Sequence, residues 1–469
     1  MKNLYDKYSK YALIILFGLF ILTLYILLLL KSQDNDMFFE IMSGKDILNG
    51  NFYTVSHLNN FPIVIQQWLY AVCMAITDQL GIIGNILFVL IQNILLFGLS
   101  CKFIYMKTKN KKLAIISSIF AIIYCYEYMI NIRPQIITVI CLVSQLIFLE
   151  LYKEKKSIKY LLPIFPILIL SANMHQAVFL YHMLIMIPYI IQLKKPYIDW
   201  KLVIFIPLFL ICSLITPYGL NGSLYIVRTF ISNSFKYVNI QEINSLNITS
   251  LVGIKLLILV VITTILIYLH KSNQYTNFYV YILFILSLIN ARHISIMYIA
   301  VLFIICTIKN FDKLKNNIVY IIGIILCMIL CLSIYNTNNI RSNYGSVADS
   351  IKDKNALIYN SDIDVGGWLE YNDCTKVKFD SRIEAFSEEI SGVPNIIKEF
   401  IAISQGYWIN SRQIFVKDNE ILDILNTYEY VVSNPSQYVN RVLSKSDEWN
   451  LIYNDNTYLV YQHNNDIKK

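Results

Sequence analysis

The stretch that decides the interpretation of this chain reads Gln33-Asp34-Asn35-Asp36-Met37-Phe38-Phe39-Glu40. It follows an apolar run over residues 11–30. A helix rises about 1.5 Å per residue, so a run of this length can cross the roughly 30 Å hydrocarbon core of a bilayer. Two carboxylates, Asp34 and Asp36, therefore stand where the chain leaves the membrane. The stretch is the first candidate for a reactive site at a membrane surface.

The composition of the chain is that of a membrane protein. Of its 469 residues, 56% are hydrophobic and only 15% are charged, and the mean hydropathy is +0.53. Apolar runs close to the ~20 residues that a transmembrane helix needs recur along the first 336 positions. The net charge of +8 does not indicate a nucleic-acid partner, because the lysines cluster in short loops between apolar runs. These features predict a polytopic α-helical protein of the cell membrane.

Basic residues predict the orientation of the chain. Lysines precede the first apolar run, so the positive-inside rule keeps the N-terminus in the cytoplasm and sends the first outer loop, residues 32–80, outside. Within that loop, residues 62–77 carry two glutamines and a tryptophan, which suit a juxtamembrane helix better than a lipid-facing span. With this segment at the interface, every basic connector falls inside. About eleven spans are then expected, at 11–30, 84–106, 113–129, 135–152, 160–172, 176–193, 202–216, 251–269, 275–289, 293–307 and 318–335.

The tail, residues 336–469, has a different pattern. Short β-rich runs alternate with helical segments, which predicts a small α/β domain outside the membrane, beside a transmembrane domain over 1–335. Strands are expected at 356–359, 376–379, 430–433 and 451–453, and helices at 365–371 and 394–404. The pair Gly366-Gly367 lies between a strand and a helix, but no phosphate-loop motif accompanies it, so nucleotide binding is not expected. Asp380 and Arg382 either pair as a structural bridge or face the membrane site.

Unusual polar residues gather at one level of the predicted topology. Charged residues at membrane depth are costly and usually face a cavity or a partner. The inner loops are plain lysine-rich connectors, whereas the outer face holds Asp34, Asp36, Glu40, Glu127, Arg133, Gln135, Asn173, His175, Gln176, Tyr218, Asn221, Glu242, Arg292 and His293. Each of these residues alone could be an ordinary solvated loop residue. Together they indicate a site.

The acids of this set could start a reaction. Asp34 and Asp36 could supply a general base, or they could be ligands for a divalent metal ion. Glu127 could be a second acid or simply the partner of Arg133.

The cations of the set suit a phosphate. Arg133 and Arg292 could hold one through forked hydrogen bonds, with His175 or His293 assisting, and Tyr218 is grouped with them as a substrate-binding residue. A water-poor groove of this kind suits transfer from a polyprenyl phosphate or pyrophosphate donor, because cations stabilise the charge that develops on the leaving phosphate.

With its outer loop, many spans and outer C-terminal domain, the chain resembles the GT-C superfamily of membrane glycosyltransferases. Protein mannosyltransferases of glycosyltransferase family 39 and aminoarabinose transferases are relatives. The chain is more closely similar to a group of prokaryotic membrane proteins whose first loop reads D-x-W-W-H-L-x-x-G-x-x-I-L, followed by W-L. The matching segments here are Asp36–Leu48 and Trp68-Leu69 in the first loop, then Arg133-Pro134-Gln135, Ala172-Asn173-Met174-His175, Pro217-Tyr218-Gly219, Ala291-Arg292-His293, Val365-Gly366-Gly367-Trp368-Leu369 and Phe379-Asp380-Ser381-Arg382.

The resemblance implies a reaction and its partners. It implies a membrane glycosyltransferase that uses a polyprenyl-phosphate-linked sugar donor and an extracytoplasmic acceptor, which could be a glycan, a lipid or a protein. The catalytic or metal-binding acid of the superfamily carries over to Asp36, or to Asp34 if the alignment shifts. Glu40 stands where the similar proteins have histidine, and Phe38-Phe39 stand where they have tryptophans. A histidine-dependent role in this loop is therefore not carried over.

Two other functions remain open from the sequence. A non-catalytic transporter or flippase of lipid-linked glycans would show polar residues on both sides of the midplane and internal repeats. The polar set lies on one side of the predicted topology and no repeat is evident, which favours an enzyme. A polymerase or ligase of O-antigen type would also need a site at the outer face.

Overall fold

The fold is taken from a computed structural model. It describes residues 2–30, 35–55, 62–125, 131–192, 197–231, 245–308, 322–323, 325–326, 344–380, 382–392, 394–408 and 415–464. The chain forms two compact units. Unit 1 comprises Met1–Ser32, Leu80–Gly219 and Gln241–Ile340, and unit 2 comprises Gln33–Gln79, Leu220–Ile240 and Arg341–Lys469.

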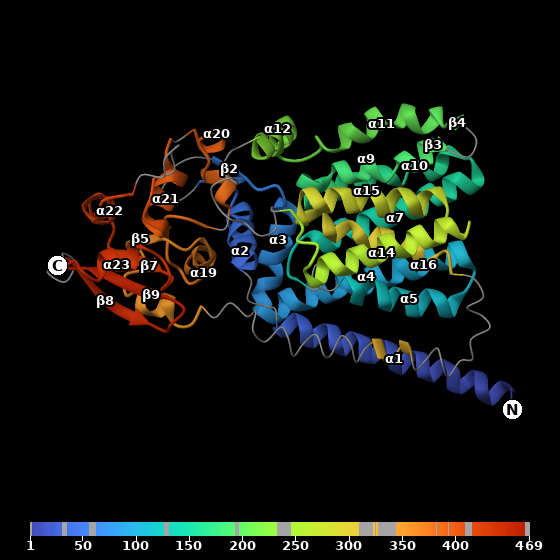
Figure 1. The fold of residues 1–469 in the computed structure, drawn as a ribbon, viewed down its shortest axis with the longest axis horizontal. Helices are drawn as coiled ribbons and strands as arrows, with labels where there is room; N and C mark the ends of the chain where they lie inside the picture. Colours follow the sequence, from blue (N-terminus) through green and yellow to red (C-terminus); the bar gives the residue numbers. More distant parts are fainter. Residues whose placement is uncertain are drawn as a thin grey trace. The chain divides into compact units, whose positions relative to one another are not determined.

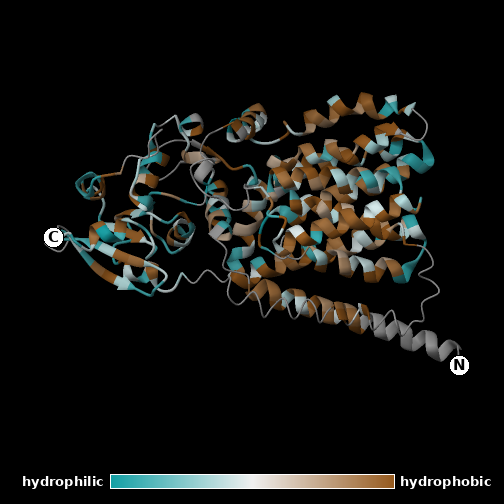
Figure 2. Ribbon diagram, in the orientation of Figure 1, coloured by the Kyte–Doolittle hydropathy of each residue, from teal (hydrophilic) through white to brown (hydrophobic). Residues whose placement is uncertain are grey.

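Unit 1 is a helical bundle (Figure 1). Figure 2 shows that its helices are hydrophobic along most of their length, as expected for segments that pack on one another and face lipid. In chain order its elements are α1 Lys2–Leu30, α4 Ile82–Thr108, α5 Lys111–Tyr124, α7 Gln135–Lys155, η2 Ile158–Tyr160, α8 Ile164–Met174, η3 Gln176–Val178, α9 Leu180–Leu184, α10 Ile187–Ile190, β3 Ile191–Gln192, β4 Tyr197–Ile198, α11 Trp200–Cys212, α14 Leu251–Tyr268, α15 Gln274–Ile289, η4 Ala291–Ile296 and α16 Met297–Ile305.

Short polar segments determine where these helices start and stop. Asn110 caps α5 by accepting the backbone N–H of Leu113 at 3.0 Å, and Asn273 caps α15 in the same way. Lys109 and Lys156 end α4 and α7 in the left-handed conformation, with φ of 56° and 53°. A cation at this position also interacts favourably with the carboxyl end of the helix dipole. The basic connectors of the sequence are therefore helix ends.

The lengths of the helices bear on the expected spans. Three helices in the described part of the chain are long and apolar enough to cross a membrane: Ile82–Thr108, Gln135–Lys155 and Leu251–Tyr268. Other apolar helices are shorter, with 10–17 residues. The span expected at 176–193 is broken into η3, α9 and α10, and most of the one expected at 318–335 lies outside the described residues. The number of eleven spans and the orientation of the termini stay predictions.

Unit 2 is built around a five-stranded mixed sheet in the order β6-β5-β7-β9-β8. Strands β6, β5 and β7 are parallel to one another, and β9 runs antiparallel to both β7 and β8. The elements of the tail are α18 Val347–Ser350, β5 Leu357–Asn360, η6 Ile363–Val365, α19 Gly366–Tyr371, β6 Lys376–Val377, η7 Ile383–Phe386, α20 Glu388–Ser391, α21 Ile396–Gln405, α22 Asp418–Leu425, β7 Tyr430–Ser433, α23 Val439–Leu443, β8 Trp449–Asn454 and β9 Leu459–His463.

This architecture agrees with the α/β tail expected from the sequence. The four expected strands and both expected helices are present, with boundaries shifted by a few residues. Strand β9, Leu459–His463, was not predicted. It lies between β7 and β8 in the sheet. The expected strand at 451–453, which is part of β8, therefore pairs with a strand that the sequence pattern did not predict.

The first loop of the chain belongs to unit 2. It contains α2 Asn35–Leu48, the hairpin of β1 Tyr53–Val55 and β2 Pro62–Val64, α3 Trp68–Thr77 and the start of η1 Asp78–Leu80. Helix α12, Gly219–Ile231, also falls almost entirely in this unit. At 14 and 10 residues, α2 and α3 are too short for a ~30 Å bilayer core, in line with a loop of juxtamembrane helices. The compact units thus group residues 33–79 with the tail, whereas the sequence grouped them with the transmembrane segments.

Candidate functional site

Asp36 lies in the first turn of α2. The residues that follow it, Met37, Phe38 and Ile41, are fully buried, and this apolar face holds the helix in unit 2. A carboxylate in the first turn interacts favourably with the positive end of the helix dipole. The stretch from Asn35 to Leu48 is thus a helix and not a strand. Asp34 lies outside the described residues.

Helix α2 packs closely against α3. A Cβ atom on Gly44 would lie 2.0 Å from the carbonyl oxygen of Ala71, so only glycine allows the two backbones to approach this far. One turn from Asp36, Glu40 accepts a hydrogen bond of 2.7 Å from the Gln67 side chain, just before α3 begins. These contacts hold α2 and α3 as one block.

The tail covers the other side of α2 with aromatic side chains. The ring of Phe38 lies 4.9 Å from that of Trp368 and 5.0 Å from that of Tyr371, both on α19. Tyr344 contacts the same phenylalanine at 5.9 Å and stacks on Trp368 at 5.5 Å. Phe38 is therefore the point at which the first-loop motif meets the Val365–Leu369 motif of the tail.

The neighbouring Phe39 meets the second tail motif. The Arg382 guanidinium carbon lies 4.3 Å from the centre of the Phe39 ring, at cation–π distance. Asp380 accepts hydrogen bonds from the backbone N–H of Arg382 at 2.8 Å and from its Nε at 2.9 Å, and it also pairs with Nη2. The structural bridge expected between Asp380 and Arg382 is thus confirmed.

Further carboxylates surround this pair. Burial raises the pKa of Glu370, on α19, to about 8, and the negative charges of Asp380 and Asp46 add to the rise while Arg382 opposes it. Burial by itself would lower the pKa of Arg382, but Asp380 and then Glu370 raise it above its ordinary value. The cluster therefore combines a carboxyl group of raised pKa with a permanently charged guanidinium.

A polar contact fixes the far end of α2. Lys45 forms a 3.1 Å ion pair with Asp78, and the Tyr371 hydroxyl donates to the same aspartate at 3.1 Å. The Lys45 ammonium also lies 5.0 Å from the centre of the Tyr371 ring. Contacts to α19 thus run from one end of α2 to the other.

Asp36 and Glu40 form the candidate acid–base pair of unit 2. Residues four apart on a helix are neighbours on one face, with Cβ atoms about 6 Å apart. Phe39, under Arg382, lies three residues after Asp36 on the same side of the helix. No group of three or more His, Cys, Asp or Glu residues suited to a metal ion occurs in the part of the chain that the structure describes. A divalent ion at Asp36 and Asp34 stays a prediction.

Unit 1 brings several of the other predicted site residues together around the end of α8. The Nδ1 atom of His175 lies 2.9 Å from the hydroxyl of Thr138, which also bonds the carbonyl of Pro134, the residue after Arg133. The side chains of Asn173 and Gln176 donate to the carbonyls of Ile215 and Ser213, at 2.8 and 3.1 Å. These bonds tie His175 to the segment that leads to the buried Tyr218.

His293 lies in η4, which packs against α7. Its Nδ1 atom hydrogen-bonds the hydroxyl of Tyr181, and the two rings are nearly perpendicular at 89°. The backbone of Arg292 lies in the same 3-10 helix, while its side chain and the whole of Glu127 lie outside the described residues. The roles predicted for these residues and for Arg133, His175, Tyr218 and His293 stay predictions.

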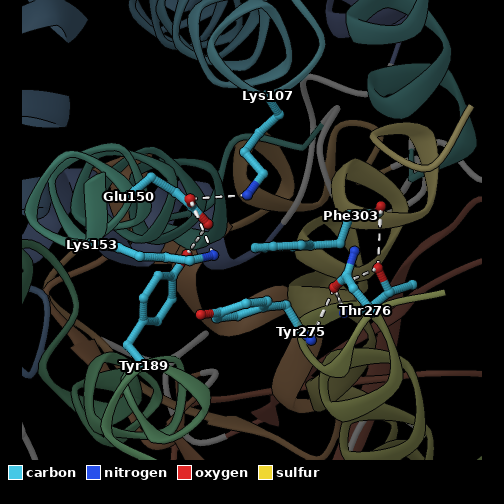
Figure 3. A network of polar contacts seen from close by, with 8 residues as sticks. Lys107, Glu150, Lys153, Tyr189, Tyr275, Thr276 and Phe303 are labelled. Atoms are coloured by element: carbon cyan, nitrogen blue, oxygen red, sulfur yellow. Dashed lines mark hydrogen bonds and ion pairs between the residues drawn. The ribbon is translucent and has the colours of Figure 1, made fainter. Parts of the chain in front are cut away.

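A second polar network in unit 1 was not predicted. Figure 3 shows the buried Glu150 of α7, which pairs with Lys107 of α4 at 2.9 Å and with Lys153 at 3.8 Å. The hydroxyl of Tyr189 donates to it at 2.7 Å, and the ammonium of Lys153 lies 4.0 Å from the centre of the Tyr275 ring. Lys107 and Lys153 come from the loops interpreted as plain connectors. The structure corrects that interpretation, since both lysines neutralise a buried acid.

Sequence reasoning also passed over the roles of Glu40 and Glu370. Glu40 was placed in the outer-face set and noted as a departure from a motif, but it was not paired with Asp36, although their helical i, i+4 spacing was the signal for it. No local pattern marks Glu370, because its partners Asp46 and Asp380 come from other parts of the chain.

Comparison with known proteins shows the fold. No protein-family profile matches the chain, and no curated protein matches it in sequence. ArnT from Cupriavidus metallidurans, in a structure bound to undecaprenyl phosphate, matches with a TM-score of 0.59 and 10% identity over 96% of this chain and 97% of that one. Its apo structure matches with a TM-score of 0.60 and 9% identity over 97% and 98% of the two chains.

An oligosaccharyltransferase from Archaeoglobus fulgidus, tethered to an acceptor peptide, matches with a TM-score of 0.58 and 11% identity. The match covers 89% of this chain and 69% of the archaeal one. The fold of this chain is therefore similar to that of ArnT and of the archaeal oligosaccharyltransferase, as the resemblance to membrane glycosyltransferases implies.

Proposed function

We propose that this protein is a membrane glycosyltransferase that transfers a sugar from a polyprenyl-phosphate-linked donor to an acceptor outside the cytoplasm. The single observation that carries the proposal is the likeness in fold, over nearly the whole chain, to ArnT with undecaprenyl phosphate bound. The likeness to an oligosaccharyltransferase tethered to an acceptor peptide supports the same class of reaction. Because a fold hosts more than one function, the site has to carry the chemistry.

Asp36 is the proposed general base. In the reaction a hydroxyl or other nucleophile of the acceptor attacks the anomeric carbon of the sugar, and the bond from that carbon to the phosphate oxygen breaks. Its electron pair leaves with the polyprenyl phosphate, and the acceptor proton passes to the Asp36 carboxylate. Glu40, one turn further on the same face of α2, is a second carboxylate that can share this proton. Both are held in place because α2 packs against α3 and α19.

Cations and a tyrosine of unit 1 are the proposed phosphate ligands. Arg133, His175 and His293 have the chemistry to bind an anion, and the buried Tyr218 belongs to the same group of segments. This role rests on the residue types and on their shared place in unit 1.

The test removes the charge of Asp36 and keeps its shape. Cells that lack the gene are complemented with the wild-type protein, Asp36→Asn, Asp34→Asn or Asp349→Asn, and their surface glycans are compared by mass spectrometry. Loss of a general base costs about 100-fold or more in rate, so Asp36→Asn is expected to give no detectable product at wild-type protein level.

Asp349→Asn is the matched control, since Asp349 is an exposed acid in the first turn of α18. It is expected to leave product formation unchanged. If Asp36→Asn and Asp34→Asn both keep full product formation, the catalytic assignment to this loop is wrong.

A further inference from the structure

The Arg382 side chain reaches from the tail onto the catalytic-candidate helix. Its guanidinium carbon lies over the Phe39 ring, 4.3 Å from the ring centre, and both side chains are largely buried, at 12% and 4% exposure. Phe39 lies three residues after Asp36 and one before Glu40. Any shift of this ring therefore turns the face of α2 that carries both carboxylates.

Asp380 fixes the direction of Arg382. It accepts from the Arg382 backbone N–H at 2.8 Å and from Nε at 2.9 Å, and it pairs with Nη2. A carboxylate bound by a guanidinium along two edges sets orientation as well as distance. The arginine thus has one favoured geometry over the ring.

The segment before Asp380 is anchored in the core of the tail. The Asn360 side chain, at the end of β5, accepts a hydrogen bond of 2.9 Å from the backbone N–H of Phe379. It also donates one of 2.8 Å to the carbonyl of Phe379. A Cβ atom on Gly366 would lie 2.0 Å from the same carbonyl, so the start of α19 is pressed against this segment. The glycine that could suggest a phosphate loop serves close packing instead. The backbone that carries Arg382 is consequently held in place by the core of the tail.

We propose that Arg382 is a positioning residue, which fixes the orientation of α2 and of the Asp36 carboxylate by stacking on Phe39 while Asp380 holds it. The proposal rests on the proposed function only for the role of Asp36. The groups that interact electrostatically with the guanidinium include Asp380, Glu370 and Tyr225, the last from α12. Because several partners respond to its charge, the stack has to be tested with a variant that keeps the charge.

Arg382→Lys is that variant. Lysine keeps the positive charge but lacks the flat fork that stacks on a ring and binds a carboxylate along two edges. Asp380→Asn is the second variant, since it keeps the size of the side chain and removes the charge that holds Arg382. The matched control is Arg441→Lys, because Arg441 also lies over a tail ring, that of Tyr438 at 5.8 Å, within the tail itself.

The first measurement is hydrogen exchange of backbone amides in the full chain, held in lipid nanodiscs. Both Arg382→Lys and Asp380→Asn are expected to speed exchange of the α2 amides about tenfold, from the loss of a desolvated cation–π contact, and to leave β5 and β7 within about twofold. The control is expected to change neither. The proposal is overturned if α2 is unchanged, or if β5 and β7 speed up as much as α2, which would mean a general loss of stability.

The second measurement is functional. Arg382→Lys is expected to lower surface-glycan product about tenfold while undecaprenyl phosphate, added as a probe, binds the nanodisc-held chain within about twofold of the wild-type affinity. Unchanged product would overturn the positioning role. If the wild-type chain neither binds undecaprenyl phosphate nor forms product, the proposed function fails, whereas the exchange experiment still decides whether Arg382 positions α2.

Discussion

At the scale of single residues, Glu370 shows how the tail creates an unusual group. Its carboxyl lies among Asp46, Asp380 and Arg382, and burial is the largest cause that raises its pKa, to about 8 from an ordinary value of 4.5. The folded chain therefore keeps the proton of Glu370 up to a higher pH than the unfolded chain does.

This difference makes the stability of unit 2 depend on pH. Below pH 4.5 Glu370 is protonated in both the folded and the unfolded chain, and its contribution to the free energy of unfolding is complete. Between pH 4.5 and about 8 this contribution is lost, because the unfolded chain releases the proton while the folded chain keeps it. Glu370→Gln keeps a neutral side chain at every pH. We expect the variant to gain stability over the wild type as the pH rises from 5 to about 8, the midpoint of unfolding differing by several degrees.

Cys374 is a local reporter for this prediction. It is the only cysteine in the tail and is 1% exposed, and its backbone N–H bonds the carbonyl of Leu369 in the adjoining helix. The rate of thiol labelling, compared between variant and wild type at each pH, measures how often this region opens. The exposed Glu388→Gln is the control. Equal labelling of wild type and Glu370→Gln across the pH range would contradict the assigned pKa shift.

Residue-level expectations succeeded where the partners are close in sequence. The Asp380–Arg382 pair was foreseen because the two residues are two positions apart. The contact between Arg382 and Phe39 was not, since these residues are 343 positions apart (382 minus 39) and no local pattern relates them.

At the scale of elements, α2 and α3 depend on one glycine. A Cβ atom at Gly44 would meet the carbonyl oxygen of Ala71 at 2.0 Å and the Cβ of Ala75 at 2.8 Å, so Gly44→Ala must push the helices apart. We expect a loss of about 1–3 kcal/mol, the usual cost of overpacking. The measurement is the rate of proteolysis in the first loop, residues 33–79, of the full chain.

Gly98→Ala is the matched control for that change. Gly98 also lies inside a helix, α4, but no atom lies within 4 Å of an added Cβ. Alanine has a better helix propensity, so this variant should gain up to ~1 kcal/mol. If the two substitutions had the same effect on their helices, the close approach of α2 and α3 would not be what Gly44 provides.

Most helices were predictable at this scale because an apolar run of sufficient length leaves few alternatives. The exceptions have physical causes. The run at 176–193 is mostly apolar, yet it forms η3, α9 and α10. Its buried His182 bonds Gln145 at 2.6 Å and Ser171 at 2.7 Å across neighbouring helices. Hydropathy cannot register such a break, since tertiary hydrogen bonds satisfy the polar groups that it frees.

At the scale of the whole molecule, the network around Glu150 ties helices of unit 1 together. Lys107, Tyr189 and Tyr275 come from α4, α10 and α15, and all of them contact the charges of α7 (Figure 3). Glu150 is 3% exposed in its side chain, so its charge depends on the two lysines.

Removing this acid should weaken the bundle. Glu150→Gln leaves Lys107 and Lys153 without their counter-charge. Because these lysines are 22% and 34% exposed and can turn to water, the expected loss is about 1–3 kcal/mol. The expected result is a lower midpoint of thermal unfolding in detergent. The exposed Glu154→Gln, four residues later on the same helix, should stay within ~0.5 kcal/mol of the wild type.

The double variant Glu150→Gln with Lys107→Met completes the test. It removes one of the two uncompensated charges and should recover part of the lost stability. Lys107→Met is also measured alone. If the stability loss of the double variant equals the sum of the losses of Glu150→Gln and Lys107→Met, the two residues are not energetically coupled.

The sequence by itself determined the membrane class, most of the helices, the α/β tail and the acidic first loop. Each of these follows from hydropathy, period or turn residues over a few neighbouring positions, which are local properties of the chain. Only the tertiary structure decided that α2 of the first loop packs against α19 of the tail, that Arg382 lies over the ring of Phe39 and that the pKa of Glu370 is raised. These depend on which surfaces meet and which charges are buried together, and residues far apart in sequence carry no local sign of that meeting.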